Sequence, residues 1–254
     1  MISEIRQFEE LGFHAWPAAQ VTHLGDWAVQ LTPYYPSKRG NSVNLLNPSD
    51  DTDLAQRVEA CEALFTAQGK QPVFRLTPLA PPSLADYLTA RGYTATGGSS
   101  VMACDLRDNA ALKTPQPRLP LRLVQFRDGQ EIGYSRISGA FHDRPEPQVE
   151  GLAEVLRSIK PQKYVIAGFA GTEPAATLLC VSENGYTGLL DLCIGEAFRR
   201  RGFAKALVLN EMAQALSRGD HCFWLQVESA NAAARALYQG LGFTTVYDYI
   251  YYCR

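Results

Sequence analysis

An internal repeat constrains the fold of this chain more than any other feature of its sequence. From about residue 41 to about residue 93 the first half matches the second half without a gap. Two pairs of turn glycines keep one spacing of 150 residues, Gly69 with Gly219 and Gly92 with Gly242. An expected helix and an expected strand keep the same spacing, 53–68 with 203–218 and 73–77 with 223–227. The repeat therefore predicts two copies of one structural unit.

A proline-rich segment separates the two copies. Pro115, Pro117 and Pro120 can neither continue a helix nor lie in a central strand, so Lys113–Pro120 is expected to be an extended linker. We predict a domain at 1–112 and a second domain at 119–254, which suits a length of 254 residues.

The order of expected strands and helices in the second half predicts an α/β fold with an α+β mixed sheet. The expected strands are 119–126, 164–169, 176–181, 186–194, 221–227 and 243–251. The expected helices are 128–141, 148–159, 200–216 and 231–241.

Composition excludes several classes of protein. A formal net charge of −2 and a pI of about 6.1 argue against nucleic-acid binding. We expect no membrane span, because no apolar run is long enough, and no signal peptide, because the first ten residues carry charges. Six cysteines without a CxxC pair indicate core packing in a reducing, cytoplasmic setting, and four histidines without metal spacing predict no metal site.

A basic loop before the helix expected at 200–216 carries the first functional signal. The segment Ile194–Ala204 ends a strand, passes through Arg199, Arg200 and Arg201, and reaches Gly202 at the helix start. Glycine allows a ligand to approach the backbone, and the first amides of a helix bind anions. Guanidinium groups add charge-assisted donors. The loop could bind a pyrophosphate, or it could be a solvated basic turn.

A second motif follows in the helix expected at 231–241. Asn231, Ala234, Arg235 and Tyr238 share one helical face. Asn231 could cap the helix, contact a ligand, or do both. Tyr238 is either a packed core residue or a hydroxyl beside a ligand.

These two motifs resemble the GNAT superfamily of N-acetyltransferases. Arg199–Ala204 is similar to the family's (Gln/Arg)-x-x-Gly-x-(Gly/Ala) acyl-CoA motif, and 231–243 is similar to its Asn…Leu-Tyr…Gly-Phe motif. The resemblance covers nearly all of 119–254. One departure is Glu196, at a position that family members often fill with proline. The whole chain resembles tandem GNAT proteins with a degenerate first half.

The resemblance implies a ternary complex of acetyl-CoA, as co-substrate, and a primary amine. The cofactor-binding residues would be Leu192, Cys193, Ile194, Arg199, Arg200, Arg201, Gly202, Phe203, Ala204 and Asn231. Backbone N–H groups near Cys193–Ile194 would stabilise the oxyanion, and Tyr238 would protonate the leaving thiolate.

The general base is less well defined by the sequence. Some family members carry a glutamate at the position of Gly188, which cannot titrate. We take Asp191 as the first candidate and Glu228 as the second, although each could be an ordinary structural carboxylate. Glu146, Glu150 and Glu154 form a helical stripe that could attract a cationic amine, but a solvated face is the more common explanation.

The first half is expected to have lost the cofactor site. With the spacing of 150 residues, Arg199–Phe203 falls on Ser49–Asp53, which replaces arginines by aspartates, and Tyr238 falls on Leu88. Carboxylates repel a pyrophosphate, and the helix start is expected to be capped by its own Ser or Asp side chains.

Alternatives remain open. The chain could use a longer acyl-CoA, or it could be a non-catalytic acyl-CoA-binding or sensing module. A nucleotide-binding enzyme is disfavoured because no GxxxxGK[ST] motif is present. A monomer and a homodimer are both compatible with the sequence, which does not identify the amine.

Overall fold

The computed structural model describes residues 2–114 and 120–254. The chain forms two compact units. Unit 1 comprises residues 1–101, 228–230 and 246–254, and unit 2 comprises residues 102–227 and 231–245. Most of the predicted linker, residues 115–119, lies outside the described residues.

Unit 1 is a mixed sheet with helices on both faces. Its helices are α1 (Ile2–Ala15), α2 (Leu54–Ala67) and α3 (Pro82–Ala90), with a 3₁₀ turn η1 at Lys38–Gly40. Its strands follow the order β1 (Gln20–Leu24), β2 (Trp27–Leu31), β3 (Ser42–Leu45), β4 (Val73–Leu76), β11 (Thr244–Cys253) and the first part of β5 (Thr94–Asp105).

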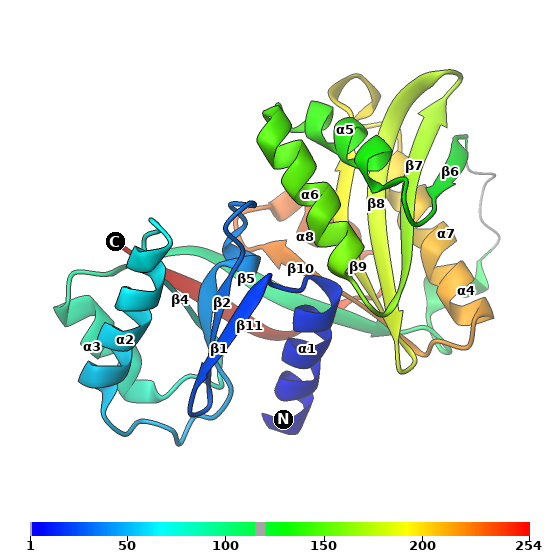
Figure 1. Cartoon of the computed structure of the whole chain (residues 1–254). Helices are drawn as coiled ribbons and strands as arrows, with labels where there is room; N and C mark the ends of the chain where they lie inside the picture. The colour runs from blue at the N-terminus through cyan, green and yellow to red at the C-terminus, as the bar shows by residue number, and fades with distance from the viewer. Residues whose placement is uncertain (1, 115–119) are drawn as a thin grey trace. The chain divides into compact units, whose positions relative to one another are not determined.

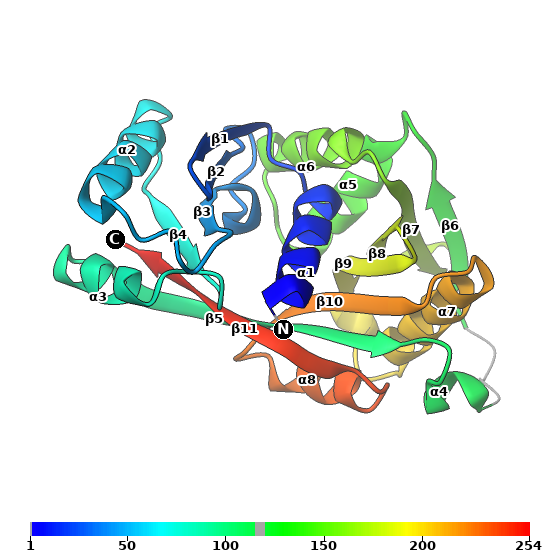
Figure 2. The same cartoon turned by 90° about the horizontal axis from the view of Figure 1, so that it is seen from below.

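The alternation of residues along β4 explains how the two faces of unit 1 are covered. Phe74 and Leu76 belong to the apolar cluster that includes the buried residues of α2 and α3. Arg75 lies between them, so its side chain points to the opposite face. There it pairs with Glu9 of α1, and both side chains are buried. Figure 2 shows α1 on one side of these strands and α2 on the other.

Unit 2 is also a layered structure. Its helices are α4 (Ala110–Lys113), α5 (Glu131–Phe141), α6 (Glu146–Ser158), α7 (Phe203–Ser217) and α8 (Ala232–Gln239), with a 3₁₀ turn η2 at Glu196–Phe198. Its strands follow the order β10 (Cys222–Glu228), β9 (Tyr186–Ile194), β8 (Glu173–Glu183), β7 (Gln162–Ala170) and β6 (Arg122–Phe126). Strands β6 to β9 form an antiparallel meander, and β10 is parallel to β9. Strands β7 to β9 lie between the α5–α6 pair and α7 (Figures 1 and 2).

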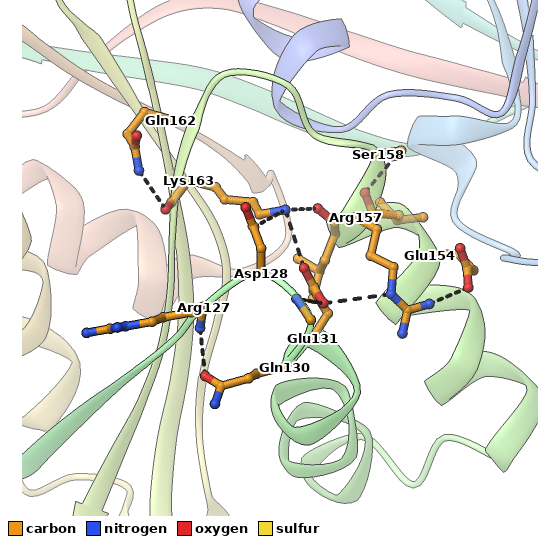
Figure 3. A network of polar contacts seen from close by, with 12 residues as sticks. Arg127, Asp128, Gln130, Glu131, Glu154, Arg157, Ser158, Gln162 and Lys163 are labelled. Atoms are coloured by element: carbon orange, nitrogen blue, oxygen red, sulfur yellow. Dashed lines mark hydrogen bonds and ion pairs between the residues drawn. The ribbon is translucent and has the colours of Figure 1, made fainter.

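The helix pair α5–α6 is fixed at one end by buried charges. Glu131, in the first turn of α5, is 2% exposed and accepts a hydrogen bond from the Gly129 amide at 2.9 Å. Its carboxylate lies 3.6 Å from Lys163 Nζ and 3.7 Å from Arg157 Nε. Lys163 also donates to the Leu156 carbonyl at the end of α6 (Figure 3). Removing the cations beside a buried carboxylate is costly, so Glu131 helps to hold α5, α6 and β7 together at this end.

The two units are built from corresponding elements. α3 and α8 begin 150 residues apart, at Pro82 and Ala232, and β5 and β11 begin 150 residues apart, at Thr94 and Thr244. The paired glycines share the left-handed backbone region, with φ of 65° and 97° at Gly69 and Gly219 and of 85° and 87° at Gly92 and Gly242.

The ungapped match is wrong by one residue in one strand. It places Phe74 opposite Trp224, whereas the apolar clusters place Phe74 and Phe223 on corresponding helix-facing sides of their sheets. Strand β4 begins four residues after Gly69, and β10 begins three residues after Gly219. A one-residue deletion in the turn of unit 2, compensated by one residue before α8, explains the shift. One residue reverses the face of every side chain in a strand.

The compact units do not follow the predicted boundaries of 1–112 and 119–254. Strand β11, at the end of the chain, pairs antiparallel with β4 of unit 1, from Ile250–Leu76 to Cys253–Val73. Conversely, Met102 and Cys104 of β5 belong to the core of unit 2, and the Leu106 amide donates to the His221 carbonyl at 2.8 Å. Each half of the chain thus contributes its last strand to the other unit. Hydropathy predicts that these residues are buried, but not in which sheet.

Candidate active site

Strand β9 has an extra residue near its carboxyl end. Thr177 of β8 is opposite Cys193 and Leu179 is opposite Leu190, so three steps along β9 face two steps along β8. Asp191 lies in this bulge with a left-handed φ of 46°. A bulge interrupts the ladder and redirects the groups that follow it, here the backbone of Leu192–Ile194.

Strands β9 and β10 pair over only part of their length. Their parallel register runs from Tyr186–Cys222 to Leu189–Leu225, whereas the strands continue to Ile194 and Glu228. In that register β10 does not pair with the last residues of β9, so those backbone N–H groups of Leu192–Ile194 that point away from β8 can meet a ligand. Burial raises the pKa of the Cys193 thiol, which therefore stays neutral near pH 7 and is a poor nucleophile.

The start of α7 has the features of an anion site. Gly202 is its N-cap with φ of 77°, and a Cβ atom at Gly202 would have no heavy atom within 4 Å. Because the N-cap residue is a glycine, it has no side chain that could cap the first amides of the helix. Arg199, Arg200 and Arg201 are all exposed beside it. The predicted combination of guanidinium groups and helix amides is therefore present at one place.

Two contacts hold the basic loop in place. Arg199 Nε donates to the Ile194 carbonyl at 3.2 Å, which ties the loop to the end of β9. The Arg201 guanidinium lies 5.5 Å from the centre of the Phe198 ring, and Phe198 stacks on Phe203 with 6.4 Å between ring centres.

Helix α8 positions Asn231 and Tyr238. The Asn231 Oδ1 atom accepts the Ala234 amide at 3.0 Å, so the predicted helix cap is present; ligand contact by Asn231 stays a prediction. Tyr238 is 8% exposed, and its ring packs 5.7 Å from that of Phe243. Among residues 2–114 and 120–254, no hydrogen-bond partner is present for its hydroxyl. Burial raises the pKa of Tyr238 to about 12, so the hydroxyl carries its proton at neutral pH.

Asp191 is surrounded by hydrogen-bond donors. Its Oδ2 atom accepts the Tyr134 hydroxyl at 2.8 Å and the Ser138 hydroxyl at 2.7 Å. Its Oδ1 atom lies 3.5 Å from Arg144 Nη2, and the carboxylate is 7% exposed. Sequence reasoning missed Tyr134, Ser138 and Arg144. Tyr134 and Ser138 are four residues apart on one buried face of α5, and this polar pair was the available signal.

The other carboxylates proposed from the sequence lie elsewhere. Glu228 is exposed at the end of β10 and is grouped with unit 1. Glu146, Glu150 and Glu154 are exposed on α6; Glu146 pairs with Arg136 at 3.3 Å, and Glu154 pairs with Arg157. The stripe is thus a solvated helix face.

Gly188 is enclosed by an aromatic side chain. A Cβ atom at this position would lie 2.6 Å from Cζ2 of Trp224 on the neighbouring strand. A glutamate here would require Trp224 to move, which gives a packing reason for the departure from the family pattern.

The corresponding helix start in unit 1 is closed by an ion pair. Asp50 Oδ2 lies 2.5 Å from Arg57 Nη1 and accepts the Asp26 amide at 3.0 Å. Its hydrogen bond with Arg57 lowers the pKa of Asp50. Capping by Ser or Asp side chains was expected here, but the N-cap residue is Asp53, and its side chain makes no cap hydrogen bond. Asp53 instead adopts the left-handed N-cap conformation that glycine adopts in unit 2.

Two further findings concern the described part of the chain. Among residues 2–114 and 120–254, no three His, Cys, Asp or Glu side chains gather to hold a metal ion. In the same ranges, no helix has the length and apolarity needed to cross a membrane.

Comparison with known proteins gives a family. Residues 125–243 match the model of the acetyltransferase (GNAT) family. The N-acetyltransferase YobR of Bacillus subtilis, itself described as uncharacterized, is 23% identical over 98% of both chains. A GCN5-related N-acetyltransferase of Kribbella flavida has a TM-score of 0.71 at 16% identity and covers 100% of this chain and 95% of its own. A tandem GNAT protein from the clavulanic acid biosynthesis pathway has a TM-score of 0.64 at 13% identity, over 97% of this chain and 86% of its own. Residues 125–243 are thus similar to the GNAT acetyltransferases, and the fold of the chain is similar to that of tandem GNAT proteins.

Proposed function

We propose that unit 2 transfers an acetyl group from acetyl-CoA to a primary amine within a ternary complex. The observation that carries the proposal is the start of α7, where Gly202 leaves open space beside three exposed arginines. Helix amides and guanidinium groups together suit a pyrophosphate. The match of residues 125–243 to the GNAT acetyltransferase family model supports acetyl transfer as the reaction.

Different residues of unit 2 are proposed to bind different parts of the co-substrate. Arg200–Ala204 would bind the pyrophosphate of the co-substrate, and the Leu192–Ile194 backbone would donate to the thioester oxygen as it gains charge. Asn231 would contact the co-substrate while it caps α8. Binding both reactants side by side would supply much of the rate enhancement.

Tyr238 is proposed as the acid that protonates the leaving thiolate. Its hydroxyl holds a proton at neutral pH and has no competing partner in the described residues. A phenol with a pKa of about 12 is a weak acid toward a thiolate, so transfer depends on close positioning within hydrogen-bond reach and on prompt consumption of the phenolate by solvent protons.

Asp191 stays a prediction as proton acceptor. Two hydroxyl donors and a guanidinium already contact its two carboxylate oxygens. A metal plays no part in the proposal, and a cytoplasmic monomer or homodimer stays a prediction from the sequence.

The test is release of CoA thiol in the presence of primary amines. A suitable panel contains a polyamine, an aminosugar, an aminoglycoside, an alanine-initiated peptide and a lysine-containing peptide with a blocked N-terminus. Amine-dependent thiol release together with an acetylated product is the expected result. Thiol release from a longer acyl-CoA at a higher kcat/KM would favour the longer-chain alternative.

Tyr238→Phe separates an enzyme from a sensing module. We expect kcat to fall by about 100-fold or more, with the Kd of acetyl-CoA unchanged in calorimetry. The control is Tyr164→Phe, whose ring lies 3.9 Å from the Arg218 guanidinium at the other end of α7. Tight acetyl-CoA binding with no thiol release toward any amine in the panel would support the sensing module.

A further inference from the structure

The turn between α5 and α6 packs against the end of β9. A Cβ atom at Gly195 would lie 2.9 Å from Cε1 of Phe141, the last residue of α5. A Cβ atom at Gly139 would lie 2.6 Å from Cγ2 of Val149, so α5 and α6 approach closely at this turn. His142 follows Phe141 directly and is exposed. Its backbone is therefore placed beside the strand end where the thioester is expected.

The same turn is tied to the bulge of β9. Arg144 donates to the Ser138 hydroxyl at 2.9 Å and lies 3.5 Å from Asp191 Oδ1. Ser138 in turn donates to Asp191 Oδ2. The opposite end of the helix pair is fixed around Glu131 (Figure 3). With both ends held, the turn has a defined place relative to β9.

Charged groups from three segments lie close enough to His142 to affect its pKa. Asp143 and Arg144 come from its own turn, Asp191 from β9, and Arg199 from the basic loop. Partial burial lowers the pKa of His142, and the cations Arg144 and Arg199 lower it further, while Asp191 and Asp143 oppose this. The imidazole is therefore neutral and able to accept a proton at pH 7.

His142 and Asp191 differ in what they can still accept. Both oxygens of Asp191 already have donors or a cation beside them. In a neutral imidazole one ring nitrogen carries no hydrogen, and its lone pair can accept a proton. The imidazole therefore keeps a nitrogen that can accept the proton of an amine.

We propose that His142 accepts the proton of the attacking amine, directly or through one water, and that Asp191 and Arg144 are positioning residues for the turn that carries it. This inference rests on the proposed acetyl transfer. As the amine nitrogen bonds to the acetyl carbon, its proton passes to His142 and the carbon–sulfur bond breaks. A second proton passes from Tyr238 to the thiolate. The exposed imidazolium then releases its proton to water, Tyr238 regains one, and the products are the N-acetyl amine and free CoA thiol.

The test is the pH dependence of kcat/KM, measured with acetyl-CoA and the fastest amine of the panel. Below the pKa of the amine, its deprotonation alone makes log kcat/KM rise with a slope of about one. A histidine that must be neutral adds a second unit of slope below its own pKa, which we expect below about 6.5. The wild type should therefore show a slope of about two at the acid end, within the range where its circular dichroism is constant.

His142→Gln is expected to lose about 100-fold in kcat and to keep a slope of about one throughout, with the Kd of acetyl-CoA unchanged. The matched control is His23→Gln, another exposed histidine, on β1 of unit 1, which should retain both the rate and the slope of two. Asp191→Asn should lower kcat but keep the slope of two, as a positioning role requires.

Three results would overturn the inference. One is a His142→Gln variant with wild-type kcat, another is a slope of two that persists in it, and the third is an acid limb that disappears in Asp191→Asn instead. If the wild type acetylates none of the amines in the panel, the proposed function itself fails. That outcome differs from acetylation that is unaffected by the substitution of His142.

Discussion

Alanine substitutions at two glycines of unit 2 can separate the effect of backbone strain on stability from an effect on ligand binding. Gly202 and Gly171 have φ of 77° and 64°, and neither would place a Cβ atom within 4 Å of another heavy atom. Only Gly202 lies at the start of a helix; Gly171 lies in the turn between β7 and β8. Alanine at either position should lower the free energy of unfolding by about 1 kcal/mol, because an L-residue is strained in the left-handed region.

Gly202→Ala is expected to weaken acetyl-CoA binding by at least about tenfold, a loss of about 1.4 kcal/mol, since its methyl group occupies the approach to the helix amides. Gly171→Ala should bind acetyl-CoA as the wild type does. Urea denaturation measures the strain, and calorimetry measures the Kd. Equal affinities in the two variants would contradict the assignment of the α7 start as the pyrophosphate site.

At this scale the sequence predicted the residues whose chemistry depends on local spacing. Gly202 at a helix start, Asn231 as a cap and Tyr238 on the same helix follow from motifs within a few residues of each other. The partners of Asp191 could not be predicted in this way, because Tyr134, Ser138 and Arg144 are about fifty residues away in the chain. His142 and Arg199 are separated in the sequence by a similar number of residues. Local sequence patterns therefore did not indicate that they lie near each other.

At the scale of elements, periodicity predicted most helices and strands within a few residues. The strand expected at 186–194 is β9 with the same bounds. The helix expected from residue 200 begins at Phe203, because Gly202 is left-handed and cannot be part of it. The match of 73–77 with 223–227 pairs residues that lie on opposite faces of their strands, since an ungapped match cannot detect a one-residue deletion in the preceding turn.

The start of α2 gives a prediction about pH and stability. The pKa of Asp50 is lowered, mainly by its hydrogen bond with Arg57, so the pair stabilises the folded state fully above the unfolded pKa of about 3.9. That stabilisation is lost as the pH falls through the lower, folded pKa. Asp50→Asn should therefore be less stable than the wild type at pH 7, and the difference should shrink below about pH 4.

Urea denaturation at pH 7, 5 and 3.5 checks this. The control is Asp51→Asn, which changes a neighbouring exposed carboxylate and should leave the stability within about 0.5 kcal/mol of the wild type. If Asp50→Asn is less stable than the wild type by the same amount at pH 7 and pH 3.5, the ion pair is not the cause of the difference.

At the scale of the whole molecule, the exchange of final strands limits how the halves can be studied. A chain cut at the linker would remove β11 from unit 1, and with it Ile250 and Tyr252, which pack on the unit 1 core. It would also remove the end of β5, including Met102, from unit 2. Each isolated half would lack a strand of its sheet, so the binding properties of the two units have to be compared in the intact chain.

The intact chain is expected to bind one acetyl-CoA. The start of α7 offers open space and three arginines, whereas the start of α2 holds Asp50 in an ion pair with Arg57. A carboxylate at the start of α2 repels a pyrophosphate through the same Coulomb interaction by which an arginine attracts it.

Calorimetry should give a stoichiometry of about one acetyl-CoA per chain, and Arg200→Asp combined with Arg201→Asp should abolish binding. The matched change in unit 1, Asp50→Asn with Asp51→Asn, should leave both stoichiometry and Kd unaltered. A second site that survives the arginine substitutions and responds to the aspartate ones would mean that unit 1 has kept a cofactor site, and its role as an inactive copy would have to be given up.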